Sequence, residues 1–267
     1  MSPTRFLFIC VGVIAAITSV REAKGQTLSG APTFLVSGRF TNPVEEGSNS
    51  LLVRDNNLTN GYNSGADLTD APAGLSSTGP AGAAFFQWGR ASTSDTYSHP
   101  SALWFIPVDV TNAAPEQDFQ IGYLYYRNGT IQSSTGASAV DMSFTFSFPS
   151  DGATMNTSFT SKLINTPNNG TAEQNADVVS LSNHFAPTGY KDSSGNAYYL
   201  ELSFKMDADT LNALSTGTEF RAYEGTTSRA EIIGRFTTTP SVAVVPEPSS
   251  LLIGLLGALP LISRRKR

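Results

Sequence analysis

The sequence predicts an all-β protein, an antiparallel β-sandwich or jelly roll, and two segments carry most of this prediction. In Val140–Phe148 and in Tyr198–Met206, apolar residues alternate strictly with polar ones. A period of two indicates a strand with one buried face and one wet face, as in antiparallel sheets. Many further short apolar segments follow at sandwich-like spacing, separated by turn-forming residues.

Eight further segments are rich in β-branched and aromatic residues and are predicted as strands. They are Phe34–Phe40, Phe85–Trp88, Leu103–Val108, Phe119–Tyr126, Met155–Leu163, Val178–Leu181, Thr218–Tyr223 and Glu231–Thr237. The segment Phe119–Tyr126 is apolar on both faces, so it should be a central strand. Only Asp209–Leu214 is predicted to be helical between the two ends of the chain.

Turns and loops follow from Gly, Asn, Asp and Pro. Asn128-Gly129 tolerates the positive φ angles of a type I′ turn and predicts a β-hairpin. Asp192–Asn196 is predicted as another turn, and Asn56–Gly82 as a long surface loop. Residues 26–240 are therefore expected to form one sandwich domain, followed by a linker over Thr237–Val245.

The first 25 residues have the composition of a secretory signal peptide. Arg5 supplies the positive charge, Phe6–Ile17 is the apolar helix, and the small residues of Ala23-Lys24-Gly25 fit a cleavage site after Gly25. The apolar stretch is shorter than the ~20 residues of a membrane-spanning helix. We expect export through the Sec translocon, with an uncleaved N-terminal anchor as the alternative.

The C-terminal end, residues 241–267, has three parts in a fixed order. Pro246, Glu247 and Pro248 form an extended segment, because prolines disfavour helix on both sides of the glutamate. The apolar run Leu251–Ile262 follows; as a helix at ~1.5 Å per residue it is only about 18 Å long. The chain then ends in a basic cluster that should stay cytoplasmic, made of Arg264, Arg265, Lys266 and Arg267.

This tail resembles the PEP-CTERM sorting signal of Gram-negative bacteria. The resemblance covers about the last 23 residues, with Pro246, Glu247 and Pro248 as the motif. It implies recognition by exosortase, a membrane transpeptidase that is thought to cut near the motif. It also implies transient association with the inner membrane and delivery to the outer surface or extracellular matrix. The alternative is an ordinary C-terminal membrane anchor.

The body also resembles the bacterial "choice-of-anchor K" domains, surface domains of unassigned activity. The resemblance rests on Gly38–Pro43, Trp88-Gly89, Ser101–Phe105, Phe119–Leu124 with Asn128, Glu224-Gly225 and Glu231–Gly234. Where that family often has His-x-Asn-x-Pro-Ile, this chain has Tyr126–Ile131 without the His and the Pro. The resemblance implies a β-sandwich and transfers no catalytic residue.

Charge and cysteine content exclude several classes of function. Residues 26–240 contain ten Lys and Arg against twenty Asp and Glu, a net charge of −10. An acidic body repels phosphate backbones, so we expect no nucleic-acid partner. The only cysteine is Cys10, inside the signal peptide, so the mature chain should have no disulfide and no thiolate site.

Catalytic chemistry has weak support in the sequence. His99 and His184 are expected to be solvated loop residues, since neither lies in a metal-binding spacing. Asp141 and Glu201 lie on the polar faces of their strands, and such carboxylates on neighbouring strands could hydrolyse glycosidic bonds. The more ordinary interpretation is that both simply face solvent, and we expect no enzyme activity.

Binding functions have more support. Six aromatic residues fall in one third of the chain: Trp88, Tyr97, Trp104, Tyr123, Tyr125 and Tyr126. Exposed rings can stack on sugar faces, so Tyr97 and Trp104 are candidate ligand contacts, unless these rings fill the core. No cofactor is expected. The oxygen-rich segments Asp55–Asp70 and Asp192–Asn196 leave calcium as the only metal considered, although their spacing is irregular.

The sequence therefore predicts an exported, non-catalytic protein of the cell surface or biofilm matrix. The first alternative is a carbohydrate-binding module, with exopolysaccharide as its partner. The second alternative is a glycosidase that uses Asp141 and Glu201.

Overall fold

The computed structural model describes residues 26–27, 31–93, 98–150, 152–192, 194–206 and 213–239. These residues form strands, turns and one short 3-10 helix, η1 (Leu58–Asn60). The all-β prediction is confirmed. Both predicted terminal helices and the sorting tail lie outside the described residues, and no helix within them is long and apolar enough to cross a membrane.

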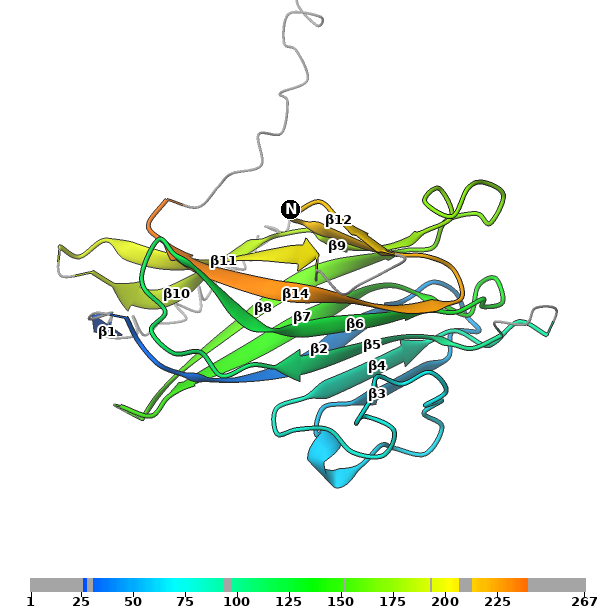
Figure 1. The fold of residues 1–267 in the computed structure, drawn as a ribbon, viewed down its shortest axis with the longest axis horizontal. Helices are drawn as coiled ribbons and strands as arrows, with labels where there is room; N and C mark the ends of the chain where they lie inside the picture. The colour runs from blue at the N-terminus through cyan, green and yellow to red at the C-terminus, as the bar shows by residue number, and fades with distance from the viewer. Residues whose placement is uncertain are drawn as a thin grey trace, which may run out of the picture.

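Two sheets pack face to face as a sandwich (Figure 1). The larger sheet has eight strands in the order β1 (Gln26–Thr27), β10 (Phe185–Lys191), β11 (Ala197–Met206), β14 (Thr226–Thr237), β6 (Asp118–Asn128), β5 (Ser101–Pro107), β4 (Ala84–Trp88), β3 (Leu52–Asp55). The smaller sheet has six strands in the order β12 (Ala213–Ser215), β13 (Glu219–Ala222), β9 (Asp177–Leu181), β8 (Ala153–Ile164), β7 (Ala137–Phe148), β2 (Leu35–Glu45). All pairings within the two sheets are antiparallel except that of β1 with β10.

The predicted alternation appears in the strands as alternating burial. In β7, Val140, Met142 and Phe144 point into the sandwich, and the polar residues between them lie on its outer face. The same holds for Leu200, Leu202 and Phe204 of β11. One apolar core fills the space between the sheets, so each strand buries one face against the opposite sheet.

Strand β6 is central, as its two apolar faces predict. It lies between β5 and β14. Leu124 and Tyr126 point into the main core, whereas Tyr125 packs against a second, smaller cluster on the outer face of the eight-stranded sheet.

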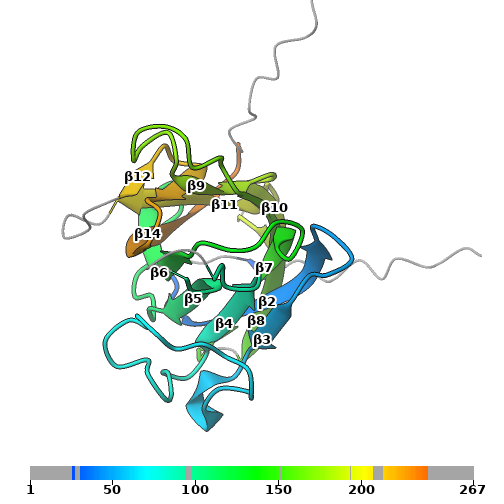
Figure 2. The same ribbon diagram turned by 90° about the vertical axis from the view of Figure 1, so that its right-hand side faces the viewer.

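The loop between β3 and β4, which includes the predicted loop Asn56–Gly82, builds this second cluster. Leu58 and Leu75 from the loop cover Phe85 and Trp104, and all four side chains are buried. Figure 2 shows the loop in cyan beside β4. The loop therefore covers the outer face of β4 and β5.

The predicted hairpin at Asn128-Gly129 is wrong. Asn128 ends β6 with its side chain buried, donating a hydrogen bond from Nδ2 to the carbonyl of Ala222 at 2.9 Å. Residues after Gly129 leave the sheet, and the next strand, β7, belongs to the other sheet. A Cβ at Gly129 would lie 2.0 Å from the carbonyl oxygen of His99, so the glycine is explained by close packing.

Other boundaries also differ from the predictions. The strands β1, β3, β10 and β12 were not predicted, and β14 begins five residues before Glu231. The predicted helix Asp209–Leu214 is wrong at its C-terminal end, where Ala213 and Leu214 pair with β13, and its residues 209–212 lie outside the described residues.

Candidate functional site

Most of the predicted aromatic cluster is core. Trp104 is fully buried beneath the loop, where its Nε1 donates to the hydroxyl of Tyr62 at 3.1 Å, so it has no face for a sugar. Trp88 and Tyr126 are buried between the sheets. The prediction that Trp104 contacts a ligand is therefore wrong in this fold, and Tyr97 lies outside the described residues.

Beyond β5, the loop reaches the outer face of the eight-stranded sheet at Tyr125 and Arg127 of β6 and at Thr227 of β14. The remainder of that outer face lies beyond these loop contacts. Alternation turns the odd-numbered residues of β14 and β11 outward there, together with parts of β6 and β10. We call this surface the open face, and define it by Tyr123, Tyr125, Phe185, Tyr199, Glu201, Ser203, Lys205, Arg229, Glu231, Ile233 and Arg235.

One end of the open face holds two partly exposed tyrosine rings and an arginine. The rings of Tyr123 and Tyr125 have centroids 6.5 Å apart. The guanidinium carbon of Arg229 lies 4.8 Å from the Tyr123 centroid, and Arg229 Nη1 donates to the Tyr125 hydroxyl at 3.3 Å. Stacking and hydrogen bonding hold the group in one arrangement, as a ligand-binding platform requires.

The other end carries a second aromatic pair. Phe185 of β10 and Tyr199 of β11 meet edge to face with centroids 6.4 Å apart. His184 lies edge to face with Phe185 at 5.5 Å. The open face thus has partly exposed rings at both ends.

Charged residues occupy the middle of the face as pairs of opposite sign. Lys205 Nζ lies 3.2 Å from Glu231 Oε2. Arg235 Nη2 lies 3.3 Å from an oxygen of Glu116, beside the face. Such groups can hydrogen-bond hydroxyls while adding little net charge.

A depression of about 430 Å³ lies beside the Lys205–Glu231 pair. Gln120, Lys205, Glu231 and Ile233 contribute to its lining. Four of its six lining residues are polar or charged, with Asp118 and Phe119 completing the set, so it is suited to hydrogen-bonding hydroxyl groups and differs from the mostly apolar pockets of small-molecule sites.

The proposed glycosidase pair is separated by the fold. Asp141 lies on the outer face of β7 in the six-stranded sheet, and Glu201 on the outer face of β11 in the other sheet. Since packed sheets are ~10 Å apart, side chains on their opposite outer faces cannot share one glycosidic bond. The carboxylate of Asp141 instead accepts hydrogen bonds from Asn42 at 2.9 Å and Thr160 at 2.6 Å.

The structure also contains a buried carboxyl group, apart from Asp141 and Glu201, that the sequence analysis did not identify. Asp177 is buried at the start of β9, and burial, together with nearby Glu224, raises its pKa to about 7 despite hydrogen bonds from Thr166. Burial and these two acids also raise the pKa of Tyr126. The adjoining cavity has room for about one water molecule, so no sugar ring can reach this group.

Both histidines lie in loops, as predicted, but each is only partly exposed and pairs with a carboxylate. His99 Nδ1 lies 3.1 Å from Asp67, and His184 Nε2 lies 3.7 Å from Glu201. Asp67 also faces the buried guanidinium of Arg127, with 3.7 Å between the nearest atoms. Arg127 Nε donates to the carbonyl of Pro100 and Nη1 to that of Thr69. Arg127 and Asp67 therefore connect the β3–β4 loop to the eight-stranded sheet.

Among the residues that the structure describes, neither oxygen-rich segment is arranged around a metal: Asp55–Asp70 contains η1 followed by turns, and Asp192–Asn196 is a turn. Asp192 accepts hydrogen bonds from the backbone of Ser194 and from the backbone and side chain of Asn196, each at 2.8 Å. The Asn196 bonds hold the pKa of Asp192 below its usual value. Within the part of the chain that the structure describes, no group of three His, Cys, Asp or Glu side chains could hold a metal ion.

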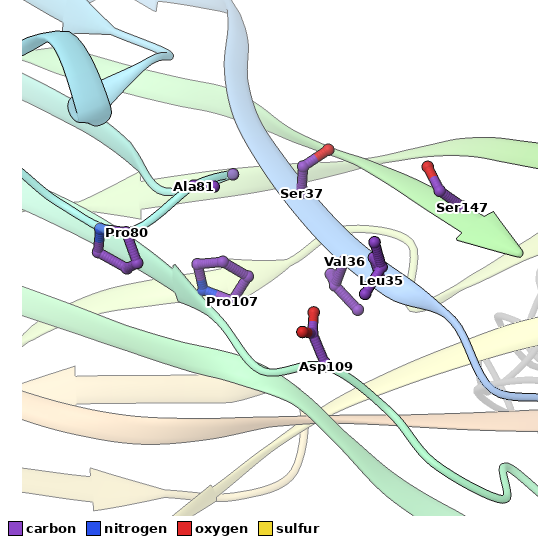
Figure 3. A pocket seen from close by; sticks show the side chains of 9 residues that line it. Leu35, Val36, Ser37, Pro80, Ala81, Pro107, Asp109 and Ser147 are labelled. Carbon is purple, nitrogen blue, oxygen red and sulfur yellow. The ribbon is translucent and has the colours of Figure 1, made fainter. Parts of the chain in front are cut away.

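Another depression, of about 470 Å³, lies where the edge strand β2 meets the loop before β4 (Figure 3). Ser37, Asp109 and Ser147 give it polar groups, and Pro80 and Pro107 are part of its lining. No aromatic ring lines it, so it lacks the feature from which sugar binding was predicted.

Comparison with models of known protein families gives no match, and comparison with curated proteins gives none either. The site is therefore argued from its geometry. Tyr123 and Tyr125 were among the aromatic residues singled out in the sequence, whereas Arg229, Phe185 and Tyr199 were not. Sheet pairing brings these residues together across long separations in sequence, and no local pattern reports it.

Proposed function

We propose that this chain is an exported, non-catalytic protein of the cell surface or extracellular matrix, whose sandwich binds polysaccharide through the open face. The order of Pro246-Glu247-Pro248, apolar run and basic end supports export and sorting by exosortase. The observation that carries sugar binding is the platform of Tyr123, Tyr125 and Arg229 on the open face, where both tyrosine rings are partly exposed.

Intact mass of the protein recovered from the surface and medium of its native host tests the sorting part. We expect loss of residues 1–25 and a cut near Pro246–Pro248. A chain that still ends at Arg267 would contradict sorting and indicate a plain anchor.

Affinity electrophoresis of the chain that begins at Gln26 and ends at Pro240 tests the binding part. We expect retardation in gels that contain a soluble polysaccharide, hydroxyethylcellulose or the anionic xanthan, and loss of retardation in Tyr123→Ala. The control is Tyr223→Ala, which removes a partly exposed tyrosine outside the open face. Equal mobility of all proteins in all gels would contradict polysaccharide binding.

A glycosidase function has little support. Asp141 and Glu201 lie on opposite outer faces, and the buried Asp177 group opens onto a space of about one water molecule. Binding without bond cleavage is therefore the function that the open face supports best.

A further inference from the structure

The two aromatic ends of the open face are far apart. Tyr125 on β6 lies opposite Arg229 on β14. Arg235, six residues further along β14, lies opposite Glu201 on β11, and Glu201 in turn lies opposite Phe185 on β10. At ~3.4 Å per residue along a strand and ~4.8 Å between strands, the diagonal from Tyr125 to Phe185 is about 25 Å. A disaccharide is too short to touch both ends.

The surface between these ends is continuous and shallow. Glu231, Ile233 and Arg235 follow one another on the outward side of β14, beside Lys205, Ser203 and Glu201 of β11. The depression beside Lys205, Glu231 and Ile233 is open to solvent and lies between the two ends. A flat surface of this kind fits a ligand that is itself extended and flat.

The charges of the face favour a neutral ligand. Each of its three cations already has a partner: Lys205 has Glu231, Arg235 has Glu116, and Arg229 has the two tyrosine rings. A polyanion would also meet the net negative charge of the domain. Hydroxyl groups, by contrast, can accept from and donate to the paired side chains.

We infer that the open face binds a single extended, uncharged β-linked glucan chain, laid diagonally from the Tyr123–Tyr125 end to the Phe185–Tyr199 end. This inference rests on the proposed polysaccharide binding and adds the ligand's charge, shape and minimum length. Stacking at the two ends fixes the chain, because rings contribute most of the apolar contact, and the charged pairs between them hydrogen-bond its hydroxyls.

Calorimetric titration with cellobiose and cellohexaose tests the length requirement on the unmodified protein. We expect cellohexaose to bind at least tenfold more tightly than cellobiose. Tyr199→Ala should remove most of that advantage while leaving cellobiose binding within about twofold, since the short sugar can still use the other end. The Tyr223→Ala control should behave as the unmodified protein.

The outcomes separate the two proposals. Equal affinity for the two sugars, or retardation by xanthan alone in the electrophoresis, would overturn this inference and leave polysaccharide binding standing. Lack of any response to hydroxyethylcellulose, xanthan and both oligosaccharides would overturn polysaccharide binding itself.

Discussion

At the scale of single residues, the buried Asp177 makes the stability of the fold depend on pH. Its carboxyl has a pKa of about 7 in the folded chain against an ordinary value of 3.8, so folding favours the protonated form. The stabilising contribution is complete below about pH 4 and is lost as the pH rises through 7. At ~1.4 kcal/mol per pKa unit, the loss is on the order of 2–4 kcal/mol.

Asp177→Asn should remove this dependence. The amide keeps an oxygen that can accept from the backbone N–H and hydroxyl of Thr166, and it carries no charge at any pH. We expect the variant to be more stable than the unmodified protein at pH 8, and this difference to shrink at pH 5. Urea unfolding at both pH values measures it, with the exposed Glu173→Gln as control. A difference that stays constant with pH would contradict the assignment.

Gly129 is a second residue whose role is local. Gly129→Ala places a methyl group against the carbonyl of His99, 2.0 Å from its oxygen, so the backbone must shift. We expect a loss of about 1–3 kcal/mol in the free energy of unfolding. Gly152→Ala is the contrast, because its φ of +69° is strained for alanine although the space around it is open. It should cost about 1 kcal/mol. A smaller loss at Gly129 than at Gly152 would contradict the packing argument.

At the scale of elements, the β3–β4 loop depends on Arg127. Its guanidinium bonds Thr69 in the loop, faces Asp67 and lies 5.5 Å from the Trp104 ring centroid. Arg127→Met keeps much of the volume and removes the charge, leaving Asp67 without this partner. Asp67 is partly exposed and keeps His99, whereas two backbone carbonyls lose their donor. We therefore expect a loss of about 1–3 kcal/mol in stability and at least tenfold faster proteolysis within Asn56–Gly82.

Arg54→Met is the matched control for this loop. Arg54 is exposed on β3, next to the same loop. Its backbone carbonyl accepts a hydrogen bond from Asn63, and its side chain makes no hydrogen bond or ion pair within the described part of the chain. We expect its proteolysis to match that of the unmodified protein. Equal cleavage rates in both variants would show that the loop is held by its apolar residues alone.

Elements with strong periodicity could be predicted, and those that depend on distant partners could not. The alternation in β7 and β11 was visible because each buries one face. Pro187 and Gly189 argue against a strand at β10. The strand forms nevertheless, because the described part of β1 pairs only with Tyr190 and Lys191 and the register with β11 shifts between Pro187 and Lys191, and proline is tolerated at such edges and bulges. Asn128-Gly129 has the composition of a turn, but the buried side chain of Asn128 finds its partner at Ala222, which no local pattern reveals.

Dependence on distant partners also limits how much of the candidate site could be predicted. Tyr123 and Tyr125 could be singled out from sequence, but their exposure could not be distinguished from that of Trp104, since all lie in strands with apolar residues on both faces. Burial of Trp104 depends on Leu58 and Leu75, contributed by a segment that was predicted as a surface loop.

At the scale of the whole molecule, the two apolar clusters should unfold separately. Trp88 belongs to the main core and Trp104 to the small cluster under the loop. Small clusters with few strands open at lower free energy than the global core. In Trp88→Phe, the remaining Trp104 fluorescence should therefore change at lower urea than that of Trp88 in Trp104→Phe. Coincident transitions would indicate one cooperative unit.

The ends of the described chain meet at one end of the sandwich. Strand β1 pairs with Tyr190 and Lys191, and β14 finishes beside Tyr199, so both lie near the turn between β10 and β11. In a molecule tethered by its C-terminal tail, the strands would then run away from the attachment point. The twelve-residue strand β14 would extend about 40 Å from it. The loop 165–176 would lie at the end of the sandwich farthest from the attachment point. The open face would then run perpendicular to the cell surface, where neighbouring molecules in the same orientation could bind one polysaccharide chain. An epitope tag near Gln26 would lie next to the attachment point, where an antibody cannot reach it. A tag in the loop 165–176 would be readily detected by antibody binding to intact cells.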